Sequence, residues 1–179
     1  MKYFIIALII LVFIVFLFII RNIIINKKIF KFLQSFSDRY KIIQAKRKSY
    51  DYVLKTDDLD IYLYVLKVPK HSEICINSKE TWKLSYSFSK NDPGKAYSSF
   101  RYLNEIEYFL KNDIITKRPY LKLIFLYKSC DKIVRYLNET ELDVVDINKS
   151  PYGYKITSFE SFSDDLDILL KKTIDNDKK

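Results

Sequence analysis

The chain has 179 residues and a formal net charge of +9, with 31 Lys and Arg against 22 Asp and Glu. It contains only two glycines, which excludes the glycine-rich phosphate loops of Rossmann and P-loop nucleotide-binding proteins. The single histidine, His71, cannot by itself build a zinc site or a serine triad, and no Cys-x-x-Cys pair occurs.

Residues 1–25 predict a membrane-spanning helix. Phe4 to Ile20 is an unbroken apolar run with Lys2 before it and Arg21 after it. A helix rises about 1.5 Å per residue, so a hydrocarbon core of roughly 30 Å needs about 20 apolar residues. The alternative, a cleaved signal peptide, has an apolar core of about 7–15 residues that ends in small residues. Residues 19–23 offer no such cleavage site, so we expect an uncleaved anchor.

Positive charge is concentrated directly after this segment. Residues 21–50 carry nine cations and one anion, whereas residues 51–179 carry 21 of each sign. Lys and Arg beside a membrane segment tend to stay on the cytoplasmic side. We therefore expect a single-pass protein of the cell membrane with its N-terminus outside and its C-terminal domain in the cytoplasm. Cys75 and Cys130, in apolar surroundings, are expected to be buried free thiols.

Residues 26–48 predict a basic amphipathic juxtamembrane helix, extending from about Lys28 to Lys48. Apolar residues recur there at steps of four and three, from Ile29 to Ile43. Such a helix can lie along anionic lipid headgroups, to which each nearby cation contributes about 1 kcal/mol. In the alternative, the apolar stripe packs on a sheet and the cations are only solvated. The cations expected at the membrane surface are Lys27, Lys28, Lys31, Lys41, Lys46, Arg47 and Lys48.

Residues 49–172 predict one mixed α/β domain with a central mixed sheet of about five strands and flanking helices, followed by a disordered tail at 173–179. The segment Asp57-Asp58-Leu59-Asp60 is expected to form a hairpin turn rather than a metal loop. Trp82, which we expect in the core, would begin a helix. The expected strands are Asp51–Thr56, Ile61–Val68 and Glu73–Asn77 as a meander, then Leu121–Tyr127, Leu142–Ile147 and Tyr154–Thr157. The expected helices are Ser99–Asn112, a short one capped by Asp131, and one beginning near Glu160.

The order helix, three-stranded meander, helix, strand, helix, strand over residues 29–157 resembles the restriction-endonuclease-like, or PD-(D/E)xK, nuclease fold. The resemblance implies an aspartate on one meander strand and an acid-x-lysine triplet on the next, which bind magnesium and activate water. Asp51 and Lys67 stand at those positions. The triplet reads Val65-Leu66-Lys67, so valine replaces the acid. Glu73 could supply a displaced carboxylate opposite Lys67, or simply a cross-strand ion pair.

The register of the hairpin at 57–60 decides whether Asp51 and Lys67 share a face of the sheet. They do if Asp51 pairs with Lys67, and they do not if it pairs with Leu66. Two hypotheses follow. The first is a membrane-tethered, non-catalytic interaction domain with a protein partner and no cofactor. The second is a divergent magnesium-dependent nuclease, with Asp51 as a metal ligand and nucleic acid as its partner.

Overall fold

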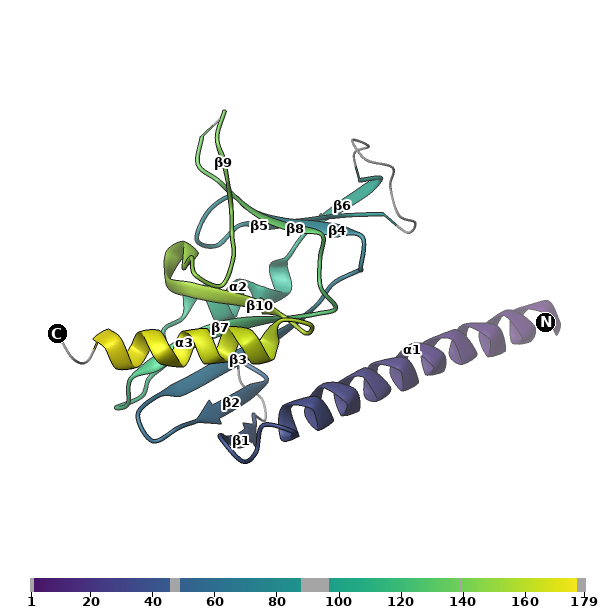
Figure 1. The fold of residues 1–179 in the computed structure, drawn as a ribbon. Helices are drawn as coiled ribbons and strands as arrows, with labels where there is room; N and C mark the ends of the chain where they lie inside the picture. Colours follow the sequence, from purple (N-terminus) through teal and green to yellow (C-terminus); the bar gives the residue numbers. More distant parts are fainter. Residues whose placement is uncertain (1, 46–48, 88–96, 139, 177–179) are drawn as a thin grey trace. The chain divides into compact units, whose positions relative to one another are not determined.

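The computed structural model describes residues 2–45, 49–87, 97–138 and 140–176 (Figure 1). The chain divides into two compact units, Met1–Ile42 and Ile43–Lys179.

The first unit is dominated by α1 (Lys2–Gln34), a continuous helix of 33 residues. At about 1.5 Å per residue it is roughly 50 Å long. Its large apolar side chains from Tyr3 to Ile20 are between 36% and 87% exposed. In length and composition α1 is able to cross a membrane, and an N-terminal signal sequence would meet the same criteria.

The expected basic helix is wrong beyond Gln34, where α1 ends. Residues 35–39 form turns, and the Ser35 hydroxyl donates to the Phe32 carbonyl at 2.6 Å. Ser and Asp compete in this way for backbone hydrogen bonds, which disfavours continued helix. A short strand, β1 (Lys41–Gln44), follows. Of the predicted surface cations, Lys27, Lys28, Lys31 and Lys41 are exposed, whereas Lys46, Arg47 and Lys48 lie outside the described residues.

The described residues form two five-stranded sheets, of which the first has the order β1-β2-β3-β7-β10. An antiparallel hairpin joins β2 to β3, whereas β3, β7 and β10 run parallel to one another. The centre of β7 is buried from Leu123 to Leu126, as is usual for a parallel strand that is covered on both faces. The strand bounds are β2 (Tyr52–Lys55), β3 (Asp60–Lys67), β7 (Tyr120–Tyr127) and β10 (Tyr154–Ser158).

The second sheet has the order β6-β5-β4-β8-β9. Its central pair, β4 and β8, is parallel, and its other neighbours are antiparallel. The strand bounds are β4 (Ser72–Ile76), β5 (Trp82–Tyr86), β6 (Ser99–Tyr102), β8 (Lys132–Tyr136) and β9 (Leu142–Val144).

Two sheets replace the expected central sheet, and the expected three-stranded meander is wrong. Only its first hairpin forms, because the second edge of β3 pairs with β7 in the register Ile61 opposite Leu121. The strand predicted at Glu73–Asn77 exists as β4 but belongs to the second sheet. A pairing partner so distant along the chain leaves no local pattern, so the sequence suggested the nearer partner instead.

After β1, fewer helices form among the described residues than the sequence predicts. The predicted helix Ser99–Asn112 begins with β6, and the expected helix after Asp131 is β8, because aromatic and β-branched residues there favour strands. Trp82, expected at a helix start, begins β5 and is buried. The helical elements are the 3₁₀ turns η1 (Asn104–Ile106) and η2 (Pro151–Gly153), α2 (Glu107–Lys111) and α3 (Phe162–Asn176).

One apolar core is shared by both sheets and α2, which lies between the sheets in Figure 1. Tyr62 and Leu66 enter it from the first sheet, Trp82 and Leu84 from the second, and Phe109 from α2. Such a core explains why the two sheets hold together without sharing a strand.

A second apolar layer lies between the first sheet and α3. The rings of Phe125 in β7 and Phe162 in α3 meet edge to face at 4.9 Å between centroids. Phe159 also contacts Phe125, at 6.2 Å. The first sheet is thus covered on both faces.

Lys122 of β7 is a charged residue inside the shared core, only 6% exposed. Its ammonium donates to the carbonyls of Phe109 at 2.9 Å and Asn112 at 2.5 Å. The Tyr154 hydroxyl donates to the neighbouring Leu110 carbonyl. Burial lowers the pKa of Lys122. These donors satisfy carbonyls at the C-terminal end of α2 that would otherwise be unpaired.

The cysteines are free, as expected, but both are partly exposed rather than fully buried. Burial raises the pKa of Cys75, and it raises that of Cys130 to about 12, so both stay thiols at neutral pH.

Candidate functional site

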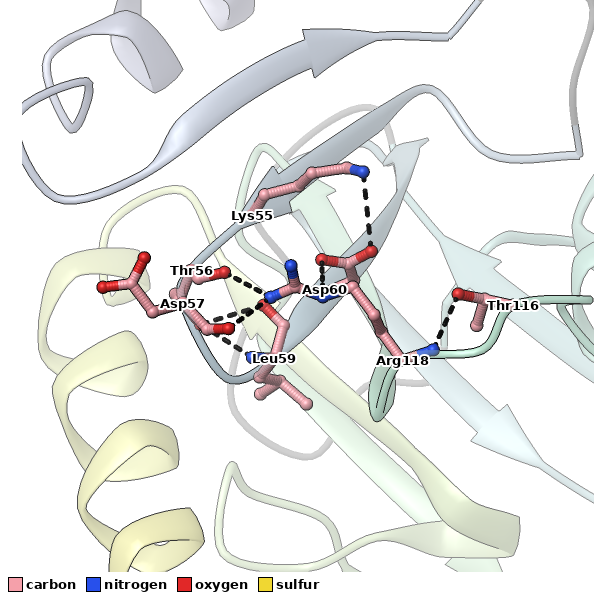
Figure 2. Close-up of polar contacts among 7 residues, drawn as sticks. All are labelled: Lys55, Thr56, Asp57, Leu59, Asp60, Thr116 and Arg118. Atoms are coloured by element: carbon pink, nitrogen blue, oxygen red, sulfur yellow. Dashed lines mark hydrogen bonds and ion pairs between the residues drawn. The ribbon is translucent and has the colours of Figure 1, made fainter.

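The acidic hairpin between β2 and β3 centres on a buried carboxylate, Asp60, which is 2% exposed. Asp60 Oδ1 lies 3.3 Å from Arg118 Nε, and Oδ2 lies 3.7 Å from Lys55 Nζ. Figure 2 shows both cations reaching the same carboxylate from different parts of the chain. A buried carboxylate needs such partners because desolvation of an unpaired charge costs several kcal/mol.

Arg118 also fixes the backbone of this hairpin. Its Nη2 donates to the carbonyls of Thr56 and Asp57, both at 2.6 Å (Figure 2). The Thr56 hydroxyl closes the turn by donating to the Leu59 carbonyl and accepting from the Leu59 N–H, both at 2.9 Å. The hairpin is therefore a structural turn, as expected, and it is tied to the segment that leads into β7.

Asp51, the predicted metal ligand, lies just before β2. Its N–H donates to the Leu63 carbonyl at 2.8 Å, and its Oδ2 accepts the Val65 N–H at 2.7 Å. The side chain thus continues the β2–β3 ladder past the end of β2. Tyr52 lies opposite Leu63, so Asp51 falls opposite Tyr64, and neither register considered from the sequence occurs. Strand alternation then places Tyr64 and Lys67 on different faces.

Asp51 and Lys67 nevertheless affect one another electrostatically. Asp51 is an exposed residue, but partial desolvation of its carboxylate raises its pKa. The hydrogen bond from the Val65 N–H and the positive charge of Lys67 offset this increase only in part. Burial lowers the pKa of Lys67, and Asp51 partly opposes that shift. The structure therefore brings two of the three predicted residues within electrostatic reach.

Glu73, the third predicted residue, lies apart from them. It pairs with Ser85 and Lys132 in the second sheet, so it does not face Lys67 as proposed from the sequence. Among the described residues, no three His, Cys, Asp or Glu side chains gather where a metal ion could bind. The three residues named by the nuclease resemblance therefore do not gather at one place, and only Asp51 and Lys67 influence one another.

A pocket of about 810 Å³ opens beside Asp51. Tyrosine side chains dominate its lining: Tyr50, Tyr62, Tyr64 and Tyr108. The rings of Tyr50 and Tyr62 meet edge to face at 4.7 Å, and Tyr62 meets Tyr120 in the same way at 6.0 Å. Mutual packing of this kind holds aromatic rings in fixed orientations.

Tyr64 is anchored at both ends. Its ring stacks on Phe109 at 5.5 Å, and its hydroxyl donates to the Glu105 carbonyl at 2.7 Å. Burial and the charges of Asp51 and Glu105 raise the pKa of Tyr64 to about 12. The phenol therefore stays neutral at physiological pH and acts as a fixed wall of the pocket.

Three carboxylates also line the pocket, those of Asp51, Glu105 and Asp113, and the other lining residues are Ser49, Ile114 and Ile115. Glu105 is held by Arg101, whose Nη1 lies 2.7 Å and 2.9 Å from its two oxygens. Burial alone would raise the pKa of Glu105, but the hydrogen bond and the charge of Arg101 outweigh it and the pKa is lowered. Within the described part of the chain, no Lys, Arg or His lines the pocket. The charged side chains of this described lining are thus all anionic.

A smaller hollow of about 390 Å³ lies where β7 and β10 end. Its polar side chains mostly satisfy one another: Ser161 donates to Asp165 Oδ2 at 2.7 Å, and Thr157 donates to the same oxygen. The hydroxyl oxygens of Ser158 and Ser161 are 3.0 Å apart. These side chains at the start of α3 thus bond mainly to one another, so the tyrosine-lined pocket is the better candidate.

No protein-family model, curated protein or solved structure matches the chain. The sequence singled out Asp51 but missed the tyrosines. Tyr62 and Tyr64 show the period of two that places both on one face of β3. Glu105 and Tyr108 reach the pocket from a segment much later in the chain, and no local pattern connects that segment with β3.

Proposed function

We propose that the chain is a single-pass membrane protein that holds a non-catalytic interaction domain at the cytoplasmic face of the cell membrane. The observation that carries the proposal is the tyrosine-lined pocket, which is an open recess of about 810 Å³. Recesses with aromatic walls and a few polar groups are the usual form of a binding site. An unidentified protein is the proposed ligand.

The membrane part of the proposal rests on α1. Its apolar side chains are exposed from Tyr3 to Ile20, and a surface of this size needs an apolar environment. The cations Lys27, Lys28 and Lys31 follow in the same helix and are exposed, which favours a cytoplasmic side lined by anionic headgroups.

The test is photo-cross-linking of the full chain in intact cells. A photoreactive residue replaces Tyr108, which lines the pocket and is 65% exposed, or Leu137, a control beside the second sheet that is 50% exposed. We expect a discrete protein adduct from position 108 only, in the membrane fraction. Equal labelling from both positions would contradict the proposal.

Retention of the anchor is tested on the same cells. Intact-mass measurement should show residues 1–25 still attached, and protease added outside the cells should leave the C-terminal domain intact. Release of a chain that lacks residues 1–25 would identify α1 as a cleaved signal sequence instead.

The magnesium-dependent nuclease stays a second candidate, favoured by the electrostatic proximity of Asp51 and Lys67. Magnesium and manganese titrations of the full chain by calorimetry test it, with Asp51→Ala as the variant and Glu73→Ala as the matched control. Saturable binding lost only in Asp51→Ala, together with DNA cleavage, would support the nuclease. The absence of binding at millimolar metal concentrations would contradict the nuclease hypothesis.

A further inference from the structure

We infer that the tyrosine-lined pocket receives an arginine side chain from a basic segment of a partner protein. The inference rests on the proposed function, because it assumes that this pocket is where the partner binds. It adds the chemistry of the contact: a planar cation held between phenol rings and carboxylates.

The tyrosine rings of the pocket can attract a cation. The face of a tyrosine ring is electronegative and attracts a cation within about 6 Å of its centre. Tyr108 is largely exposed at the pocket, while Tyr50, Tyr62 and Tyr64 are fixed by their neighbours. A ligand cation therefore meets rings that need little reordering, which limits the entropy cost of binding.

The carboxylates of the pocket favour a cation that donates hydrogen bonds. Asp51 and Asp113 are both exposed at the pocket. Arg101 shows how the third carboxylate, Glu105, already binds a guanidinium from outside the lining. A second guanidinium can pair with a carboxylate and stack on a tyrosine at once, whereas a quaternary ammonium offers no donor.

The negative charge of the pocket lining disfavours anionic ligands. Phosphate groups of nucleic acid or lipid would meet carboxylates here and no lysine, arginine or histidine among the described lining residues. Like charges in a recess repel strongly. The pocket volume of about 810 Å³ exceeds that of one side chain, so a short peptide around the arginine also fits.

The test measures peptide binding to the full chain in uncharged maltoside micelles, by calorimetry. The probes are short Gly/Ser peptides whose central residue is arginine, citrulline, lysine or trimethyl-lysine. Citrulline keeps the shape of arginine without its charge. We expect arginine to bind most tightly, lysine roughly 3–10-fold more weakly, and citrulline not at all. Affinity should fall as salt rises.

Matched variants locate the contact. Tyr108→Ala should weaken arginine-peptide binding roughly 3–30-fold, and Asp113→Asn about tenfold. Tyr136→Ala and Asp58→Asn, exposed positions outside the pocket, should leave binding unchanged. Thermal unfolding of each variant checks that it is folded.

The outcomes separate this inference from the proposed function. Equal binding of arginine and citrulline peptides, or no binding at all, overturns the inference. If position 108 still cross-links to a protein in membranes, the proposed function stands without it. Tighter binding of trimethyl-lysine than of arginine also overturns the inference, because it would identify a cage for quaternary ammonium groups.

Discussion

Asp60 is a carboxylate that the fold buries almost completely and then pairs with two half-exposed cations, Arg118 and Lys55. Such a pair adds little net stability over an apolar pair of the same shape, but removal of one partner leaves a buried charge. The arrangement therefore fixes the geometry of the hairpin more than it strengthens the fold.

Arg118→Met is the variant that tests this role. It removes the nearer cation from Asp60 and two hydrogen bonds to the hairpin backbone. We expect the free energy of unfolding to fall by about 1–3 kcal/mol, because Lys55 and water compensate only in part. Denaturant unfolding of the full chain in detergent measures it, with the exposed neighbour Lys117→Met as control. Equal losses in the free energy of unfolding for the two substitutions would contradict a role of Arg118 in fixing the hairpin.

Asp51 makes stability depend on pH in a stated direction. Its pKa is raised in the folded state above the ordinary value of 3.8, chiefly by desolvation. The folded state therefore binds this proton more tightly than the unfolded state does. The resulting contribution to the free energy of unfolding is complete below about pH 3.8 and is lost as the pH rises through the pKa of Asp51 in the folded state. At neutral pH, the charged Asp51 costs the fold some stability.

Asp51→Asn should remove this dependence while it keeps an oxygen that accepts the Val65 N–H. We expect the variant to gain stability relative to the natural chain as pH rises from about 4 to 7. Thermal unfolding across that range measures the gain, and Asp58→Asn in the exposed hairpin loop serves as control. A constant difference across the range would contradict a raised pKa of Asp51.

At the scale of elements, α2 has only five residues and cannot be stable alone. Lys122 and Tyr154 hold its C-terminal carbonyls from neighbouring strands. Lys122→Met keeps the apolar volume but leaves these carbonyls without the ammonium. We expect a loss of about 1–3 kcal/mol in the free energy of unfolding, measured beside the exposed Lys132→Met as control. A smaller loss than in that control would contradict the capping role.

Four of the five strands of the first sheet could be predicted from the sequence because apolar runs and turn residues bound them, whereas β1 lies where the sequence predicts a basic helix. β2, β3, β7 and β10 all lie close to the predicted ranges. Pairing could not be predicted, since nothing near β3 indicates a partner as distant along the chain as β7. The short strands β6 and β8 lie where the sequence predicts helices, because so few residues fit either period.

The candidate site was predictable only in part for the same reason. Asp51 stood out through its acidity at a strand start, and alternation along β3 indicates the shared face of Tyr62 and Tyr64. The remaining wall comes from η1, α2 and the segment after it. Its position depends on packing between the two sheets, which short-range patterns do not encode.

At the scale of the whole molecule, the proposed orientation rests on the cations that end α1. Replacement of Lys27, Lys28 and Lys31 by Ser, together with insertion of three Lys after Met1, gives four Lys before the apolar segment and leaves only Arg21 and Arg39 in the 20 residues after it, which reverses the local charge asymmetry. We expect a substantial fraction of chains to insert with the domain outside the cell, where added protease can reach it. The same three Ser substitutions without the insertion serve as control. An unchanged orientation after full reversal would contradict the charge rule for this chain.

The long-range partnership of β3 with β7 also bears on how the protein is made. Asp60 of β3 lies opposite Tyr120 of β7, so β3 is synthesised well before the strand that pairs with it. At about 5–20 residues per second, translation takes roughly 3–12 s to supply the missing partner. During that interval α1 is already outside the ribosome, and the edge of β3 that β7 will cover remains open. Chaperone occupancy on the nascent chain should therefore peak before Tyr120 leaves the ribosome and fall after β10 has followed.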